Sequence, residues 1–140
     1  MGLGGYSPTP AAASTATTTV KYHQDAAHFG GQNSYWVDAT VTVKSEGEWR
    51  YTLNGTLSGR CTNVTGPDEW MALDYGSSKE SWETLQFRCH NDSSTVTVTG
   101  HGSVSEDRAV HLRDCAFGGG KFLFIKAGVW NCGEEKIVHI

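Results

Sequence analysis

Four cysteines constrain this sequence more than any other feature. They are Cys61, Cys89, Cys115 and Cys132, and no two of them have the CxxC spacing of a zinc site or a redox centre. An even set of cysteines without that spacing is typical of disulfide pairs in an oxidising compartment. We therefore expect two disulfides in a secreted, extracellular protein.

Four cysteines permit three pairings, and the sequence favours pairing between neighbours. Cys61–Cys89 would close a loop of about 28 residues and Cys115–Cys132 one of about 17, each worth roughly 3 kcal/mol in the chain-entropy picture. The crossed pairings stay open. A metal site that uses Cys89 and His90 is disfavoured, because adjacent strand residues point to opposite faces. We predict no metal and no cofactor.

Apolar and polar residues alternate with a period of two from Tyr35 onward. This period indicates strands with one buried face, and no segment sustains the helical period of about 3.6 residues. We therefore predict an all-β fold, a small antiparallel β-sandwich or barrel of about seven or eight short strands. The expected strands are 35–44, 49–54, 69–75, 82–90, 94–99, 109–115, 121–126 and 136–140.

Some details of this fold depend on single residues. Trp49 shares a strand face with Tyr51 and Leu53, which predicts that its indole lies in the core. Asn54-Gly55 predicts a bend or bulge in the same strand. The run Gly118–Gly120 predicts a flexible hairpin loop, since a β-pattern and not a helix follows it.

Residues 1–34 differ in composition from residues 35–140. They are rich in Gly, Pro, Ala and Thr and contain few large apolar side chains. This composition predicts an extended N-terminal tail before a single disulfide-linked β-domain. The β-branched run Thr17–His23 predicts a strand in that tail that pairs with a partner protein, with Val20 and Tyr22 as its contact side chains.

The charge distribution excludes one class of partner. The net charge is −4, and the eleven Lys and Arg residues are dispersed along the chain, so no basic patch is available for a phosphate backbone. We expect no nucleic-acid partner. No apolar run reaches the roughly 18 to 20 residues that span a bilayer, so no membrane span is predicted.

No motif in the chain predicts catalysis. Six histidines are present, yet none has HxH or HExxH spacing. The serine-containing turns Gly100–Ser103 and Tyr75–Ser78 lack the GxSxG elbow of a serine hydrolase. We therefore predict a protein that is not an enzyme and has no catalytic residues.

Tryptophans are the residues that most indicate binding. Trp36 and Trp82 fall on the polar faces of their expected strands, which predicts exposed indole rings. Such a ring stacks on a sugar or anchors a protein interface, because it offers a large apolar area with little entropy to lose. The alternative is that each ring is covered by the N-terminal tail or lies at a strand end.

These features together predict a secreted, non-catalytic binding or adaptor module of an extracellular assembly. Its N-terminal segment engages a partner protein, and Trp36 and Trp82 are further partner-binding residues. A carbohydrate-binding module that uses these two rings and Trp70 is the first alternative. An inhibitor of a secreted hydrolase, with its binding loop at 66–70 or 117–121, is the second.

Overall fold

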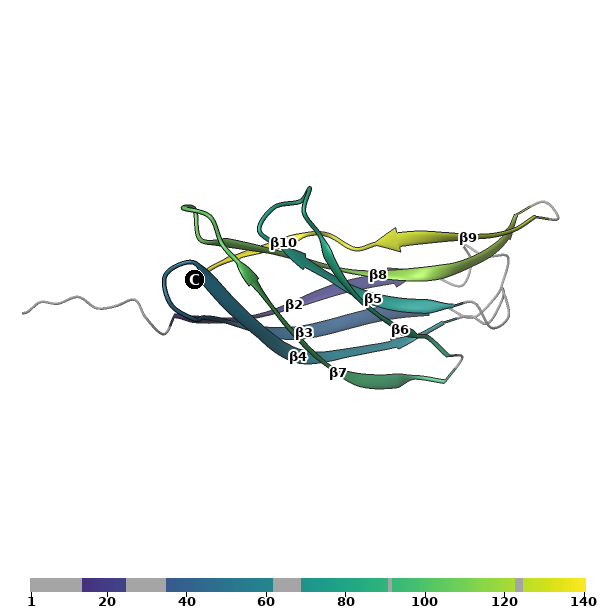
Figure 1. Cartoon of the computed structure of the whole chain (residues 1–140). Helices are drawn as coiled ribbons and strands as arrows, with labels where there is room; N and C mark the ends of the chain where they lie inside the picture. The colour runs from purple at the N-terminus through teal and green to yellow at the C-terminus, as the bar shows by residue number, and fades with distance from the viewer. Residues whose placement is uncertain (1–13, 25–34, 62–68, 91, 123–124) are drawn as a thin grey trace, which may run out of the picture.

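The computed structural model describes residues 14–24, 35–61, 69–90, 92–122 and 125–140. These residues form nine β-strands in two antiparallel sheets that pack face to face (Figure 1). The described parts of the chain contain no helix that is long and apolar enough to cross a membrane. The predicted all-β fold is confirmed, and it is a sandwich.

One sheet has four strands in the order β2-β3-β4-β7. The strands are β2 (Thr15–Gln24), β3 (Tyr35–Ser45), β4 (Arg50–Arg60) and β7 (Ser94–Ser103). Pairing of β3 with β4 runs without a skipped residue from Trp36 opposite Arg60 to Ser45 opposite Tyr51. The bulge predicted at Asn54-Gly55 is therefore wrong, because Gly55 lies directly opposite Val41 within this continuous register.

The other sheet has five strands in the order β10-β8-β5-β6, with β9 also paired to β8. The strands are β5 (Trp70–Gly76), β6 (Glu83–Arg88), β8 (Ala109–Phe122), β9 (Ile125–Cys132) and β10 (Lys136–His139). The long strand β8 pairs with β10 and β9 along one edge, and with β5 along the other.

The edge formed by β9 and β10 contains a β-bulge. Cys132 lies opposite Cys115 and Lys136 lies opposite Leu112, so β9 and β10 have one residue more than β8 between these two pairs. The Gly133 amide donates to the Asp114 carbonyl oxygen at 2.8 Å within the bulge. A side chain at Gly133 would clash with the Lys21 carbonyl of β2, so glycine allows the two sheets to approach at this edge.

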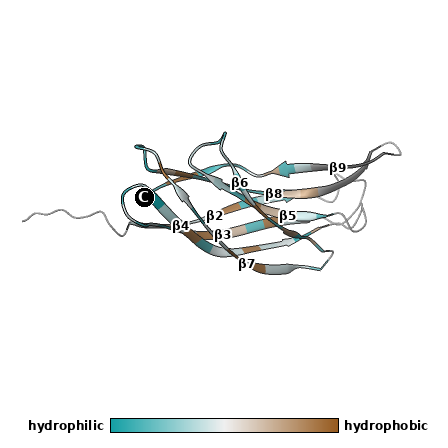
Figure 2. Ribbon diagram, viewed as in Figure 1, coloured by the Kyte–Doolittle hydropathy of each residue, from teal (hydrophilic) through white to brown (hydrophobic). Residues whose placement is uncertain are grey.

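The core lies between the two sheets. Inward and outward residues alternate along β3, β4 and β7, and Figure 2 shows brown, apolar positions between paler or teal ones along these ribbons. The largest fully buried apolar side chains include Tyr51, Leu53, Leu57, Met71, Leu73, Leu112, Val20, Val37, Val41, Val43 and Val98.

Both disulfides have the neighbouring pairing that the sequence favoured. Cys61–Cys89 joins the residue after β4 to the residue after β6, and therefore links the two layers of the sandwich. Cys115–Cys132 joins directly opposed residues of β8 and β9 within one sheet. The two disulfides use all four cysteines, so the chain has no free thiol.

Two further expectations are wrong. The predicted strand at 121–126 is two strand ends, because Lys121 lies opposite Lys126 and Phe122 opposite Ile125 across the β8–β9 hairpin. The predicted hairpin loop at Gly118–Gly120 is part of β8 for the same reason.

The expected position of the Trp49 side chain is also wrong. It precedes β4, in the turn that follows β3, and 47% of its surface is exposed. The alternation that places Tyr51 and Leu53 in the core therefore does not extend to it, because a turn residue is not bound by the strand period.

The N-terminal segment contributes a strand to the sandwich. Ten residues of β2 pair with β3, from Thr15 opposite Lys44 to Gln24 opposite Tyr35. The described part of the predicted 1–34 tail is therefore an edge strand of the same sheet as residues 35–45. The residue run Thr17–His23 forms a strand as its composition indicated. This strand pairs with β3 of the same chain.

Candidate functional site

The outward face of the five-stranded sheet carries a row of aromatic side chains. Trp70 on β5 lies opposite Arg88 on β6 and opposite Phe117 on β8. Phe117 in turn lies opposite Trp130 on β9. The register of the sheet therefore aligns a cation and three aromatic rings across four strands.

Ring contacts connect this aromatic row. The Arg88 guanidinium lies over the Trp70 ring, 4.2 Å from its centroid, which is the geometry of a cation–π contact. The rings of Phe117 and Trp130 have centroids 5.1 Å apart and are tilted by 53°. Trp130 is 42% exposed, so it presents open indole surface to a ligand.

A polar row crosses the same face at the second outward position along β5 from Trp70. Asp74 on β5 lies opposite Thr84 on β6 and opposite Arg113 on β8. The Thr84 hydroxyl donates to Asp74 Oδ1 at 2.6 Å, and Arg113 Nε donates to Asp74 Oδ2 at 2.8 Å. The Asp74 side chain is only 8% exposed, so this carboxylate is a fixed anchor for both partners.

Trp82 and His111 pack beside the polar row, on the side away from the aromatic row. The Arg113 guanidinium lies 4.5 Å from the Trp82 ring centroid, and the Trp82 ring meets the His111 ring edge to face at 6.4 Å. His111 Nδ1 is hydrogen-bonded to the Glu135 carboxylate. Arg113 is therefore positioned by Asp74 on one side and by an indole on the other.

Between these two rows lies a third row, in which the groups on β5, β8 and β9 are small. Ala72 on β5 lies opposite Gln86 and opposite Cys115, and Cys115 is bonded to Cys132. Ala72 and the disulfide extend less far from the sheet than the side chains of the rows beside them. A cavity of about 350 Å³ therefore opens above them. We call it the outer-face cavity, lined by Ala72, Asp74, Thr84, Gln86, Arg113, Trp130 and the disulfide.

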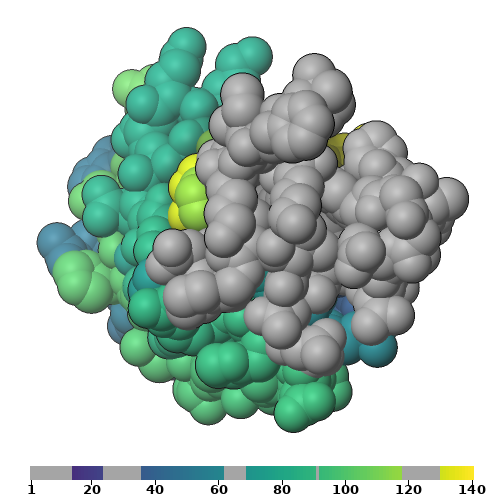
Figure 3. Space-filling view, turned by 90° about the vertical axis from the view of Figure 1, so that its right-hand side faces the viewer, coloured from purple at the N-terminus to yellow at the C-terminus, as the bar shows by residue number. Residues whose placement is uncertain are grey.

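The three-row arrangement explains what the cavity offers a ligand. One wall supplies the Trp130 ring, and the other supplies the Asp74 carboxylate, the Thr84 hydroxyl and the Arg113 guanidinium. In the space-filling view, a lime-coloured part of β8 and yellow C-terminal residues lie side by side at the surface (Figure 3). The volume falls within the range of about 300 to 1,000 Å³ for small-ligand pockets.

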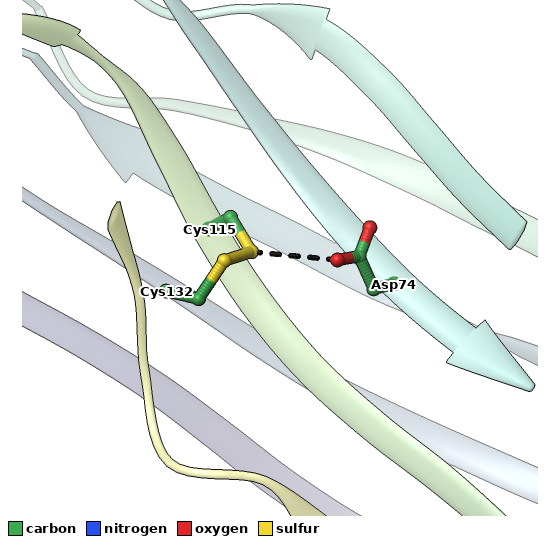
Figure 4. A group of neighbouring side chains, drawn as sticks. All are labelled: Asp74, Cys115 and Cys132. Carbon is green, nitrogen blue, oxygen red and sulfur yellow. Dashed lines mark hydrogen bonds between the residues drawn. A yellow bond between two sulfur atoms is a disulfide. The ribbon is translucent and has the colours of Figure 1, made fainter. Parts of the chain in front are cut away.

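The floor of the cavity brings a carboxylate next to two sulfur atoms. Asp74 Oδ2 lies 3.5 Å from Cys115 Sγ, as the dashed line in Figure 4 marks. A disulfide sulfur carries no hydrogen and no negative charge, so this approach is a contact in which the sulfur donates nothing. For the same reason Asp74, Cys115 and Cys132 are not a metal-binding set while the disulfide is intact, although their ligand-type atoms lie within 4.8 Å of one another.

Two other cavities have different linings. One of about 470 Å³ lies between the ends of β4, β7 and the β5–β6 connection, and Arg50, Tyr51, Glu83 and His101 contribute to it. Burial raises the pKa of Tyr51 to about 12, so its hydroxyl keeps its proton at neutral pH. A third, of about 320 Å³, lies beside Lys21. Neither contains an exposed aromatic ring like Trp130.

The structure separates the residues that the sequence suggested for binding. Val20 is 1% exposed and lies in the core, and Tyr22 packs partly against it. Trp36 lies on β3 near His23, with ring centroids 6.4 Å apart, on the outward face of the four-stranded sheet. Trp82 directly precedes β6 of the other sheet, where its ring lies against the Arg113 guanidinium. Of the predicted set, Trp82 and Trp70 are therefore near the outer-face cavity.

Trp130 was missed by sequence reasoning, although a signal for it exists. It precedes Cys132 by two residues, so on a strand the two side chains share a face. Arg113 precedes Cys115 by two residues and Phe117 follows it by two, so both share its face. Once Cys115–Cys132 is taken as a cross-strand disulfide, the period of two places all three side chains around it.

Comparison with known proteins gives no further information about this site. No family model, curated protein or solved structure matches the chain.

Proposed function

We propose that this protein is an extracellular, non-catalytic binding module whose ligand is a carbohydrate held in the outer-face cavity. The observation that carries the proposal is the arrangement of an exposed indole opposite a fixed polar row, with a floor of small groups between them. A sugar ring has an apolar C–H face and a rim of hydroxyl groups. It therefore matches a site that has one aromatic and one hydrogen-bonding wall.

Each wall has a distinct part in this proposal. Trp130 stacks on the apolar face of the sugar, because its ring is exposed and is backed by Phe117. Arg113 donates hydrogen bonds to sugar hydroxyls with the guanidinium nitrogens that do not bond Asp74. The cavity volume suits a mono- or disaccharide, or the end of a longer chain.

Two observations favour this cavity over the N-terminal strand as the binding element. β2 is already paired with β3 over its whole length, so donation of this strand to a partner would break ten residue pairs of its own sheet. It would also remove Val20 from the core, at a cost of about 1.5 to 3 kcal/mol for that side chain alone.

The inhibitor alternative finds less support. Residues 62–68, which include most of the first predicted inhibitory loop, lie outside the described residues. The second predicted loop, at 117–121, belongs to strand β8 and is paired with β9. The extracellular location rests on the two disulfides, which form and persist in oxidising compartments.

Glycan-array screening of the full chain, followed by titration calorimetry with the best-bound saccharide, tests the proposal. Trp130→Ala is expected to weaken binding about tenfold or more, because it removes the stacking surface. Trp49→Ala is the matched control, since Trp49 is exposed to a similar extent in a turn away from the cavity. A protein that binds no saccharide, or that loses equal affinity in both variants, would refute the proposal.

A further inference from the structure

The edge strands of the sandwich differ in how they are protected against pairing with other chains. An edge strand presents unpaired amide and carbonyl groups, and proteins usually block such an edge with a charged side chain, a proline, a bulge or a short strand. Four of the described edge strands follow this rule. β2 contains Lys21, β6 contains Glu83 and Arg88, β9 contains Lys126 and β10 contains Lys136.

Strand β7 has none of these protections. Its sequence from Ser94 to Ser103 contains no charged residue and no proline. It pairs with β4 over ten consecutive residues without a bulge, and no described strand pairs with its other edge. Figure 1 shows it as the last strand of its layer. β7 is therefore a long, regular and uncharged edge.

The sequence of β7 is also complementary to itself. In an antiparallel pair centred on Thr97, Thr97 lies opposite its own copy, Thr95 opposite Thr99, and Val96 opposite Val98. Threonine then meets threonine on the outward face, and valine meets valine on the inward face. No charge is brought opposite its own copy, which is the condition that a two-fold symmetric contact must meet.

The four-stranded sheet extends naturally through such a contact. Thr97 ends a row of threonines that crosses the sheet, with Thr56, Thr40 and Thr19 as its other members. A second copy added at β7 continues this row with its own Thr97. Exposed Thr95, Thr97 and Thr99 side chains lie on the outward face, so they pair without disturbing the core.

We propose that β7 is a self-association edge, at which a second copy of this chain pairs antiparallel through its own β7 to form a continuous eight-stranded sheet. The partner that the edge fits is another copy of this chain, because the residues of one β7 strand match those of a second β7 strand in the antiparallel register. The contact uses the four-stranded sheet and leaves the outer-face cavity of the other sheet open, so the proposal stands apart from carbohydrate binding.

Sedimentation equilibrium of the full chain over a range of concentrations measures this association. The wild-type chain is expected to show a monomer–dimer equilibrium. Thr97→Lys is expected to raise the dimer Kd about tenfold or more, because two ammonium groups then lie opposite each other at the two-fold axis. Thr97→Glu is expected to do the same with two carboxylates.

An equal mixture of Thr97→Lys and Thr97→Glu supplies the decisive measurement. The two variants are expected to form a heterodimer with a Kd near that of wild type, because opposite charges now meet at the axis. A variant that simply misfolds would not be rescued by mixing. Thr40→Lys adds the same charge to the same face of β3, away from the edge, and is expected to leave the dimer Kd unchanged.

Three results would overturn the proposal. The wild-type chain could be monomeric at all concentrations, the Thr97 variants could dimerise as wild type does, or the mixture could fail to recover association. If β7 instead pairs with an extended peptide from another protein, the chain alone is a monomer, and its β7 edge is occupied only when that peptide is present.

Discussion

The two outward faces of the sandwich have similar strand geometry and very different surfaces. On the four-stranded sheet the register aligns two neighbouring rows of short polar side chains. The rows are Thr17–Thr42–Asn54–Thr99 and Thr19–Thr40–Thr56–Thr97. On the five-stranded sheet an aromatic row and an ion-paired row stand on either side of Ala72 and a disulfide.

The difference shows which residues of a sandwich are free to create a site. Inward residues of both sheets are fixed by the need to fill the core. Outward residues have no such constraint, so their side chains can extend from the sheet to equal or unequal heights. Equal heights give the level threonine face, where Thr17 and Thr42 bond through their hydroxyls at 2.9 Å. Unequal heights give the outer-face cavity.

The ion pairs of the two faces differ in the same way. On the level face Asp38 Oδ1 lies 2.8 Å from His23 Nε2, and the two side chains are 34% and 59% exposed. On the hollow face Asp74 is almost fully buried between Thr84 and Arg113. An exposed pair contributes little to stability, whereas loss of one partner from a buried pair leaves an uncompensated charge.

Asp74→Ala is therefore expected to have the largest effect. It should lower the free energy of unfolding by about 3 kcal/mol, because Arg113 and Thr84 lose their common acceptor. Asp38→Ala on the other face should lower it by about 0.5 kcal/mol. Urea denaturation of both variants measures the difference, and equal losses would show that the two faces are energetically alike.

A pH-dependent effect of intermediate size comes from the residue next to Arg113. Asp114 points into the core, where it is 0% exposed, and neither carboxyl oxygen has a hydrogen-bond partner among the described residues. Burial, with a smaller contribution from the charge of Asp38, raises the pKa of Asp114 from 3.8 to about 8. The folded chain thus binds a proton that the unfolded chain releases.

The sign of the pH dependence follows from this difference. Below about pH 4 Asp114 is protonated in both states and costs no ionisation energy. Between about pH 4 and 8 its contribution makes the fold progressively less stable, and above the folded pKa the loss is complete. Asp114→Asn should therefore gain about 2 kcal/mol or more over wild type at pH 9, and little at pH 4.

Denaturation of both chains at the two pH values measures this difference. The comparison at each pH removes the contributions of the other titrating groups, which both chains share. A difference that does not change between pH 4 and pH 9 would show that Asp114 is ionised or paired in the folded protein, contrary to its burial.

The same contrast explains how far the sequence predicts the structure. The inward alternation of β3, with Val37, Val41 and Val43, is imposed by the core, and it predicts the strand and its buried face. The sequence also favoured the observed disulfides, because short loops favour pairing between neighbouring cysteines, although it left the crossed pairings open. Where the core does not impose alternation, prediction fails, as at Trp49 in a turn and at 121–126, where two strand ends meet.

The candidate site was harder to predict because it depends on register. Trp130, Arg113 and Ala72 come from three strands, and only the pairing of β9 with β8 and of β8 with β5 brings them together. An amino-acid pattern within one strand gives the face of each side chain and not its neighbours across the sheet. The Cys115–Cys132 disulfide fixes the position of Trp130 relative to β8. No comparable link fixes the position of Ala72.

Ala72 is also the residue at which the hollow face can be made level. Ala72→Leu adds three carbon atoms above the floor of the outer-face cavity, between the Trp130 wall and the Asp74 wall. The proposed saccharide should then bind about tenfold more weakly, a loss of about 1.4 kcal/mol, because the added side chain occupies its volume. The free energy of unfolding should change by less than about 1 kcal/mol, since the cavity has room for the new atoms.

Thr40→Leu makes a similar addition to the level face and should leave saccharide binding unchanged. Calorimetric titration of both variants distinguishes a ligand that fills the cavity from one that only touches its rim. If Ala72→Leu binds as wild type while Trp130→Ala does not, the sugar stacks on the outer side of the indole and the hollow between the rows plays no part. If Ala72→Leu and Trp130→Ala both lose binding, the ligand contacts the indole ring and the cavity floor together. Only a ligand in that position is affected by both substitutions.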